Sequence, residues 1–308
     1  MTLRRLVLSA ALLSASLSIV VPTHAQSPIT SDPAPDKSNP ATMQSFQLPS
    51  HGALLNALVY IASGAGPHPT VILLHGFPGN EKNLDIAQTL RRAGYDVLYF
   101  NYRGSWGSPG DFSLTHSIED TQSAIAFMRD TANAKKFRAD PSNIILIGHS
   151  MGGFMARYVG AKDPAIQGVG LISAADMGVD IANATKPGQE KEAIDRLAAG
   201  LAKNGMAPLA GCTPESLAKE IFANAAAWNT VNLAPKLANR PVFVITSDDG
   251  LAPSNDAFVA ALRKAGATDL TTVHLTTDHS YSDQRIALES AVLEALESLQ
   301  HNPAAPKP

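Results

Sequence analysis

The chain has 308 residues, 45% of them hydrophobic and 17% charged, a composition that fits an ordinary globular protein rather than a disordered or fibrous one. Its formal net charge of −3 and the lack of long Lys/Arg runs argue against a nucleic-acid-binding surface. Cys212 is the only cysteine, which excludes an intramolecular disulfide and a cysteine metal cluster. We expect it to be a small buried apolar residue.

The first residues have the layout of a secretory signal peptide. Arg4 and Arg5 form a positive start, residues 6–21 are apolar and uncharged, and Thr23-His24-Ala25 offers a small residue before a cut. The apolar stretch is too short for a typical membrane span. We therefore expect a signal peptide over 1–25 and an exported, periplasmic or secreted protein without stable membrane insertion. The alternative is an uncleaved N-terminal anchor.

Residues 26–42 are rich in Ser, Pro, Asp and Asn and have no hydrophobic period, which predicts a flexible linker. Residues 43–300 are expected to form one domain. Residues 301–308 contain three prolines, which predicts a disordered tail. Strands and helices alternate along the first part of this domain. We expect strands at 45–48, 54–61, 70–74, 95–101, 143–147 and 168–173, and helices at 81–93, 117–130 and 150–161. The first two strands are candidates for a hairpin.

One stretch interrupts this alternation. Residues 177–239 contain no convincing strand, and two segments within them, 190–201 and 214–227, have helical patterns. We expect a helical cap insertion over the strand ends; the alternative is a longer crossover on the sheet face.

The alternation resumes after the insertion, with strands expected at 241–246 and 271–275 and helices at 254–265 and 282–299. Strand–helix alternation over this length predicts an α/β protein with a mostly parallel central sheet flanked by helices.

The segment around Ser150 carries the clearest chemical signal. An apolar strand, 143–147, runs into Gly148-His149-Ser150-Met151-Gly152, and a helical pattern follows at once. In this context the GxSxG pattern indicates a sharp turn that strains Ser150 and projects its hydroxyl, while Gly148 and Gly152 avoid collisions. The start of the helix directs free N–H groups at developing negative charge. The alternative is a glycine-rich turn with an incidental serine.

From residue 70 to about 299 the sequence resembles the α/β-hydrolase superfamily, and most closely its branches of small esterases and serine peptidases. The resemblance implies the α/β-hydrolase fold and a Ser, acid, His order of catalytic residues along the chain. The motifs that carry it are His75-Gly76-Phe77-Pro78-Gly79, Asn101-Tyr102-Arg103-Gly104, the pentapeptide around Ser150, Asp249-Gly250-Leu251-Ala252-Pro253, and His279.

A serine hydroxyl needs a base to take its proton, and nine histidines are available. His279 stands in a loop between an expected strand and an expected helix, after the candidate acids, as the order of the superfamily requires. His274 falls inside the strand, where packing or solvent exposure explains it. We therefore predict that His279 is the general base.

Two carboxylates, Asp248 and Asp249, follow the strand at 241–246. The superfamily usually places its acid four residues before a proline, and Asp249 has this relation to Pro253, so we predict Asp249. Asp248 would orient the turn or be solvated. Asp278 ranks last, because a residue adjacent to the histidine rarely reaches the correct ring nitrogen.

The oxyanion site of such an enzyme uses two backbone N–H groups. We predict that one belongs to Met151, the residue after the nucleophile. By the resemblance, the other belongs to Phe77. Arg103 lies in a loop expected near the mouth of the site, where it either binds a substrate carboxylate or, more simply, braces the loop.

The leading interpretation is an exported serine hydrolase that cleaves carboxylic esters through an acyl-enzyme, with a small acyl compound as substrate and no metal or organic cofactor. The alternative is a serine peptidase or amidase with the same triad. A third is a binding protein that lost the chemistry. A peptidase that trims free N-termini needs carboxylates for an ammonium group, and the candidates in the insertion are Glu190, Glu192, Glu215 and Glu220.

Overall fold

The computed structural model describes residues 27–178 and 188–300. The expected signal peptide and the expected tail therefore lie outside the described residues. Within the described part, no helix combines the length and the apolar character that crossing a membrane requires.

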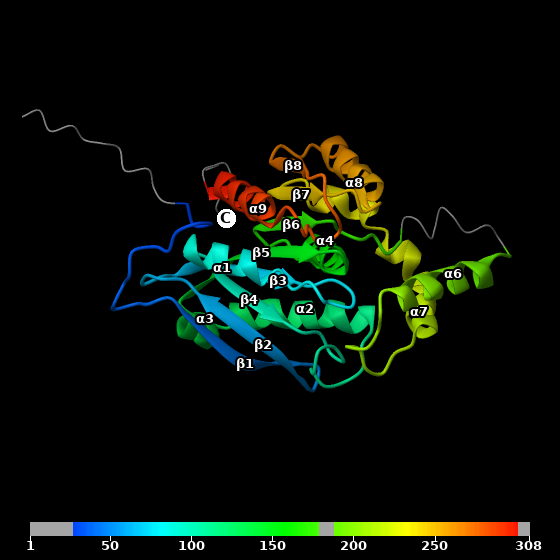
Figure 1. Ribbon diagram of the computed structural model, residues 1–308, viewed down its shortest axis with the longest axis horizontal. Coiled ribbons are helices and arrows are strands. Elements are labelled where there is room, and N and C mark those ends of the chain that lie inside the picture. The colour runs from blue at the N-terminus through cyan, green and yellow to red at the C-terminus, as the bar shows by residue number, and fades with distance from the viewer. Residues whose placement is uncertain (1–26, 179–187, 301–308) are drawn as a thin grey trace, which may run out of the picture.

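A single sheet forms the centre of the molecule (Figure 1). Its eight described strands lie in the order β1-β2-β4-β3-β5-β6-β7-β8. β2 runs antiparallel to both of its neighbours, and all pairs from β4 to β8 are parallel. The strands are β1 (Thr42–Ser50), β2 (Ala53–Ile61), β3 (His68–Leu74), β4 (Asp96–Phe100), β5 (Ala139–His149), β6 (Gly168–Ile172), β7 (Val242–Thr246) and β8 (Leu270–His274).

Helices cover both faces of the sheet (Figure 1). Buried residues of α1 and α9 share a hydrophobic cluster on one face, and those of α2, α4 and α8 share a cluster on the other. This three-layer arrangement confirms the expected α/β architecture. The helices are α1 (Leu84–Arg92), α2 (Leu114–Arg129), α3 (Thr131–Phe137), α4 (Met151–Lys162), α6 (Glu190–Lys203), α7 (Pro214–Trp228), the 3₁₀ helix η1 (Thr230–Lys236), α8 (Ala252–Lys264) and α9 (Arg285–Gln300).

The expected strands and helices are all present, with ends shifted by a few residues. The first strand pair forms the expected antiparallel hairpin. Helix α3 was not predicted, because the helical pattern was expected to stop at Asp130. The Asp130 side chain instead accepts hydrogen bonds from the amides of Ala132 and Asn133, and so begins a new helix where α2 ends.

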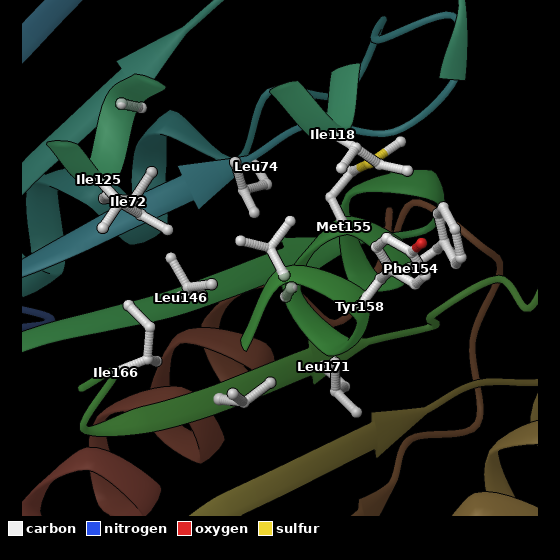
Figure 2. Packing of buried hydrophobic residues seen from close by; sticks show 14 of the residues in the cluster. Ile72, Leu74, Ile118, Ile125, Leu146, Phe154, Met155, Tyr158, Ile166 and Leu171 are labelled. Carbon is white, nitrogen blue, oxygen red and sulfur yellow. The ribbon is translucent and has the colours of Figure 1, made fainter. Parts of the chain in front are cut away.

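The core between the sheet and α4 is shown in Figure 2. Leu146 and Leu171, on β5 and β6, belong to the same buried cluster as Phe154 and Met155 of α4. Full burial of such a side chain contributes about 1.5–3 kcal/mol relative to exposure. The strand before Ser150 and the helix after it are therefore held in one tightly packed layer.

The segment before β1 is attached to the body of the protein, which differs from the expected flexible linker. Ile29 packs against the cluster of α1 and α9, and the Arg92 guanidinium donates to the backbone carbonyls of Pro28 and Ile29. A polar, proline-rich composition predicts flexibility, but here one apolar side chain and two carbonyl groups find partners on α1.

The insertion contains α6, α7 and η1, and its described residues, 177–178 and 188–239, include no strand of the sheet. In Figure 1, α6 and α7 extend past the end of the sheet. Backbone bonds join Pro208 and Ala210 to Trp106 and Phe112, in the loop that follows β4. Part of the insertion therefore lies against a loop at the carboxyl ends of the strands, as a cap would, and α7 also contacts α2.

Candidate active site

Ser150 lies in the sharp turn between β5 and α4. Its backbone has φ 56° and ψ −121°, a strained conformation for a residue with a side chain, and its amide donates to the Ile172 carbonyl at 3.0 Å. A Cβ atom on Gly148 would lie 2.0 Å from the Gly152 carbonyl oxygen, and one on Gly152 would lie 2.0 Å from the Leu74 oxygen. Both glycines are therefore required for close approach, as expected.

The loop after β3 passes directly beside Ser150. A Cβ atom on Gly76 would lie only 3.4 Å from the Ser150 hydroxyl oxygen. Met151 is the first residue of α4, so its amide has no acceptor within the helix. Within the described chain, neither the Met151 amide nor the Phe77 amide donates a hydrogen bond to another residue. Both predicted oxyanion donors are thus available to an incoming oxygen.

His279 and Asp249 face each other across the ends of β7 and β8. The His279 Nδ1 and Asp249 Oδ2 atoms are 2.7 Å apart, and the Asp249 side chain is only 3% exposed, against 40% for His279. Burial raises the pKa of Asp249, but hydrogen bonds from His279, Ser173 and the Leu251 amide outweigh it, so the pKa lies well below its ordinary value. Because the carboxyl is ionised and can only accept, the shared proton resides on Nδ1 of His279.

Asp248 has a different partner from Asp249. Its side chain is 56% exposed and lies 3.1 Å from Nε2 of His274. Its backbone amide donates to the Thr277 carbonyl at 3.0 Å, which ties the turn after β7 to the loop that carries His279. The geometry therefore pairs Asp249, and not Asp248, with His279.

Asp278, the last-ranked candidate, turns away from the histidine ring. Its carboxylate accepts hydrogen bonds from the amides of Ser280 and Ser282 and from the Ser282 hydroxyl. These local bonds shape the loop before α9. Asp278 thus orders the backbone next to His279 and is not its carboxylate partner.

His149 has a role that the sequence did not indicate. Its Nε2 atom lies 2.8 Å from the His279 carbonyl oxygen, and the two ring centroids are 4.7 Å apart with the ring planes tilted by 37°. Burial lowers the pKa of His149 to about 4, so the ring is neutral and can donate from Nε2. The residue before Ser150 thereby holds the backbone of His279.

The Ser150 hydroxyl and the His279 ring share no hydrogen bond, although both lie in the described part of the chain. Such bonds are often long in unliganded enzymes and tighten when substrate binds. His149 connects the two residues, because it precedes Ser150 in sequence and holds the His279 carbonyl.

Arg103 braces its loop. Its guanidinium lies 2.7 Å from Asp120 Oδ1, donates to the His116 carbonyl at 3.0 Å, and also contacts Glu119, and its side chain is only 9% exposed. Of the two expected roles, this geometry supports bracing rather than recognition of a substrate carboxylate. Trp106, in the same loop, donates from Nε1 to the Pro78 carbonyl at 2.8 Å and so ties this loop to the one beside Ser150.

A buried cation beneath the site was also missed from the sequence. Arg157 of α4 is fully buried, and its Nη1 atom lies 3.9 Å from Asp176 Oδ2, while the guanidinium also bonds Asn255 and Thr230. Burial lowers the pKa of Arg157 to about 10, so it remains charged at neutral pH. The one available signal was an arginine within the otherwise apolar Phe154-Met155-Ala156-Arg157-Tyr158 segment.

In the described chain, no group of three or more His, Cys, Asp or Glu side chains is placed to hold a metal ion. The groups that converge at the carboxyl ends of the strands are instead a serine, a histidine, a carboxylate and free backbone amides. This set can activate a hydroxyl and stabilise an oxyanion.

Comparison with known proteins points to the α/β-hydrolase fold. A family model described as alpha/beta hydrolase fold matches residues 69–208. The chain is 32% identical over 105 residues to an sn-1-specific diacylglycerol lipase of Xenopus tropicalis (33% of this chain, 30% of that protein), and 26% identical over 151 residues to the esterase EstD of Thermotoga maritima (45% and 34%). The chain thus spans about a third of the length of the curated relatives it matches.

The solved structure of a lipase in its open form superimposes with a TM-score of 0.64 at 16% sequence identity, covering 85% of this chain and all of the lipase. At this identity the likeness concerns the fold alone. The family match, the strand order and the serine turn agree with one another. The chain has the α/β-hydrolase fold, and residues 69–208 match that family's model.

Proposed function

We propose that the protein is a serine hydrolase that cleaves carboxylic esters, with Ser150 as nucleophile, His279 as general base and Asp249 as acid. One observation carries the proposal: a strained serine lies beside a loop with a free amide, and an ionised, buried carboxylate holds the neighbouring histidine at 2.7 Å. Similarity to an esterase and a lipase supports ester hydrolysis.

The reaction follows from these positions. His279 Nε2 takes the proton of the Ser150 hydroxyl while the oxygen attacks the acyl carbon, and the resulting oxyanion accepts hydrogen bonds from the amides of Phe77 and Met151. His279 then gives its proton to the leaving alcohol, which leaves an acyl group on Ser150. A water molecule, activated in turn by His279, releases the acid and restores the serine.

Asp249 takes no proton in these steps. It fixes the histidine tautomer and stabilises the imidazolium that forms when Ser150 attacks. Its depressed pKa keeps the Asp249 carboxyl ionised at neutral pH.

The amidase alternative requires groups that bind the amine side of its substrate. Glu220, one of the four carboxylates considered for this purpose, instead accepts hydrogen bonds from the amides of Leu114 and Thr115 at 3.0 and 2.8 Å, and so caps α2. Glu190 is bonded to the Gly188 amide. These contacts favour ester cleavage over the trimming of free N-termini.

We further propose that residues 1–25 direct export and are removed. The motivation is their sequence alone: two arginines, an uncharged apolar stretch and a small residue at position 25. Mass spectrometry of the protein from the secreting cell would show a mature N-terminus at Gln26. A full-length chain in the membrane fraction would instead support the anchor.

A panel of chromogenic substrates tests the proposed activity. We expect p-nitrophenyl esters to be cleaved with a higher kcat/KM than aminoacyl p-nitroanilides, and Ser150→Ala to abolish both activities. A higher kcat/KM on the anilides would contradict the esterase proposal and favour a peptidase. Esters of increasing acyl length, measured in the same series, would define the acyl preference.

A further inference from the structure

The loop after β3 has a backbone carbonyl on each side of the Phe77 amide, and each of these carbonyls lies next to a side-chain nitrogen. The His75 Nδ1 atom lies 2.8 Å from the Gly76 carbonyl oxygen, and the Trp106 indole donates from Nε1 to the Pro78 carbonyl at 2.8 Å. Because a carbonyl oxygen only accepts, His75 also donates, from Nδ1. The segment that carries the predicted oxyanion donor is therefore held on both sides.

These two hydrogen bonds limit the directions in which the Phe77 amide can point. A peptide unit is planar, so the unit that carries the Gly76 carbonyl also carries the Phe77 N–H, which points the opposite way. On the other side, the proline ring fixes φ of Pro78, so few rotatable bonds separate the Pro78 carbonyl from the Phe77 amide. A Cβ atom on Gly76 would lie 3.4 Å from the Ser150 hydroxyl oxygen, so the amide that is held in this way lies close to the nucleophile.

Gly79 leaves the space in which the two donors come together. Its φ of 93° lies in the left-handed region that favours glycine. A Cβ atom on Gly79 would collide with His75 Nδ1 and would lie 2.9 Å from Trp106 Nε1. Both donor nitrogens therefore lie against the same glycine, and the loop from 75 to 79 closes around them.

Trp106 is itself held from several sides. Its backbone has φ 48°, a conformation that residues with side chains rarely adopt and that persists where surrounding contacts enforce it. Its amide donates to the Pro208 carbonyl of the insertion at 2.9 Å, and Ser105 and Leu209 form an antiparallel bridge beside this bond. The Lys82 ammonium lies 4.2 Å from the centroid of the indole ring. These contacts fix the direction of the indole N–H.

We propose that Trp106 is a positioning residue for the oxyanion site: its indole N–H keeps the Phe77 amide aimed at the oxygen that becomes negative. This inference rests on the proposed function and on the proposed role of Phe77. It also gives the insertion a part in catalysis, because residues 208–210 hold the backbone from which the indole projects. Besides the bond to the Trp106 amide, the Ala210 amide donates to the Gly104 carbonyl at 2.8 Å.

The loss of the indole N–H has an effect that a general loosening of the fold does not have. Without it the Phe77 amide samples more directions, so the oxyanion is stabilised less while the ester itself binds as before, and kcat falls at constant KM. A thionoester, in which sulfur replaces the carbonyl oxygen, gains less from the amide because sulfur is a weak acceptor. The ratio of ester to thionoester rates therefore reports the position of the amide.

The test compares Trp106→Phe with Trp228→Phe, the same change at the other tryptophan of the chain. Trp228, at the end of α7, is buried, and its ring centroid lies 5.6 Å from that of Phe154 in α4. Rates are measured on an ester that the wild type cleaves and on its thionoester, and are normalised to the fraction of enzyme that a fluorophosphonate titrates to completion. We expect Trp106→Phe to lower kcat on the ester about 10-fold with little change in KM, and to lower the ester-to-thionoester ratio by a similar factor. Trp228→Phe should keep the wild-type ratio.

Trp106→benzothienylalanine provides a second test, because this residue keeps the shape of the indole and exchanges only its N–H for sulfur. It should lower kcat and the ratio in the same direction, and it decides the matter if Trp106→Phe does not fold. A folded variant with the wild-type ester-to-thionoester ratio would overturn the positioning role, and so would an equal fall of this ratio in Trp228→Phe. Failure of the proposed function would look different, because the wild type itself would then not react with the fluorophosphonate at Ser150.

Discussion

Helices α4 and α6 differ sharply in how the protein holds them. Every residue from 151 to 161 in α4 is buried, whereas Ala198 is the only buried residue described in α6. The first helix begins at Ser150 and the second lies in the insertion. The helix that follows Ser150 is therefore held by contacts along its whole length. Helix α6 of the insertion is held by far fewer buried contacts.

Specific polar contacts hold the insertion to the rest of the molecule. At its end, Thr230 of η1 bonds Asp176 through its amide at 3.1 Å, and Asp176 lies against Arg157 of α4. In its middle, Glu220 of α7 caps the first turn of α2. Substitutions at the strand ends should therefore abolish chemistry, while substitutions at these anchors should change stability and substrate binding.

The largest effect is expected from His279→Ala. Without its base, the Ser150 hydroxyl stays protonated, and kcat on an ester should fall by about 10⁵–10⁶-fold. The matched control is His274→Ala, which removes a half-exposed histidine bonded to Asp248. Steady-state rates of the two variants check the assignment; a comparable loss in His274→Ala would contradict it.

Asp249→Asn should lower kcat by about 10⁴-fold, because an amide no longer fixes the histidine tautomer or stabilises the imidazolium. Asp248→Asn makes the same change in the adjacent residue, which is exposed and paired with His274, and should leave kcat near the wild-type value. If the two variants exchanged these phenotypes, the acid would be Asp248.

Arg157→Met tests the buried ion pair between Arg157 of α4 and Asp176. It leaves the fully buried Asp176 carboxylate without its cationic neighbour, so the free energy of unfolding should fall by about 3–5 kcal/mol. Urea unfolding of the single variant and of Arg157→Met/Asp176→Asn measures this effect. The double variant should recover part of the loss, and a double variant less stable than the single one would argue against the ion pair.

Acid should destabilise the site through its neutral histidines. Burial lowers the pKa of both His75 and His149 to about 4, so between about pH 6.5 and 4 the unfolded chain binds a proton on each that the folded chain excludes. Each group should then lower the free energy of unfolding by up to about 3 kcal/mol at pH 4, and neither should matter above pH 7.

Asp96 has the opposite effect. Burial raises its pKa to about 7, so its contribution to the free energy of unfolding increases as the pH falls from 7 toward 4. Asp96→Asn should therefore steepen the acid loss. Urea midpoints at pH 7, 5.5 and 4.5 compare the variant with the wild type. A flatter pH dependence in Asp96→Asn would contradict this sign.

The smallest effect is expected from Glu220→Gln. Loss of the charged cap on α2 should cost about 1 kcal/mol of stability and loosen α7, so that KM for longer acyl esters rises while kcat changes little. The matched control is Glu215→Gln, in the first turn of α7, the helix that also carries Glu220. A fall in kcat as large as that of Asp249→Asn would place Glu220 in the chemistry.

The sequence predicted the parts of this protein that depend on local pattern. Buried apolar runs and a glycine-flanked serine were sufficient for the sheet and the turn at Ser150. The choice of Asp249 as the partner of His279 came instead from the resemblance to the α/β-hydrolase superfamily. Parallel strands bring their carboxyl ends to one edge, so motifs far apart in the sequence were expected to meet there.

The parts that were missed depend on contacts between distant residues of ordinary type. His149 and His279 are 130 positions apart, and Arg157 and Thr230 are 73 apart, so no short window of sequence contains either pair. A buried histidine or arginine has no pattern of its own until the fold supplies its partner. The attachment of Ile29 to the body was missed for the same reason.

Covalent labelling with a fluorophosphonate tests the central claim most directly, because the reagent reacts with a serine only where a base and an oxyanion site activate it. We predict one adduct on the folded wild-type protein, located at Ser150 by peptide mass spectrometry, with none on Ser150→Ala and strongly slowed labelling of His279→Ala. A folded wild-type protein whose Ser150 stays unlabelled would contradict the assignment of this site as a serine hydrolase.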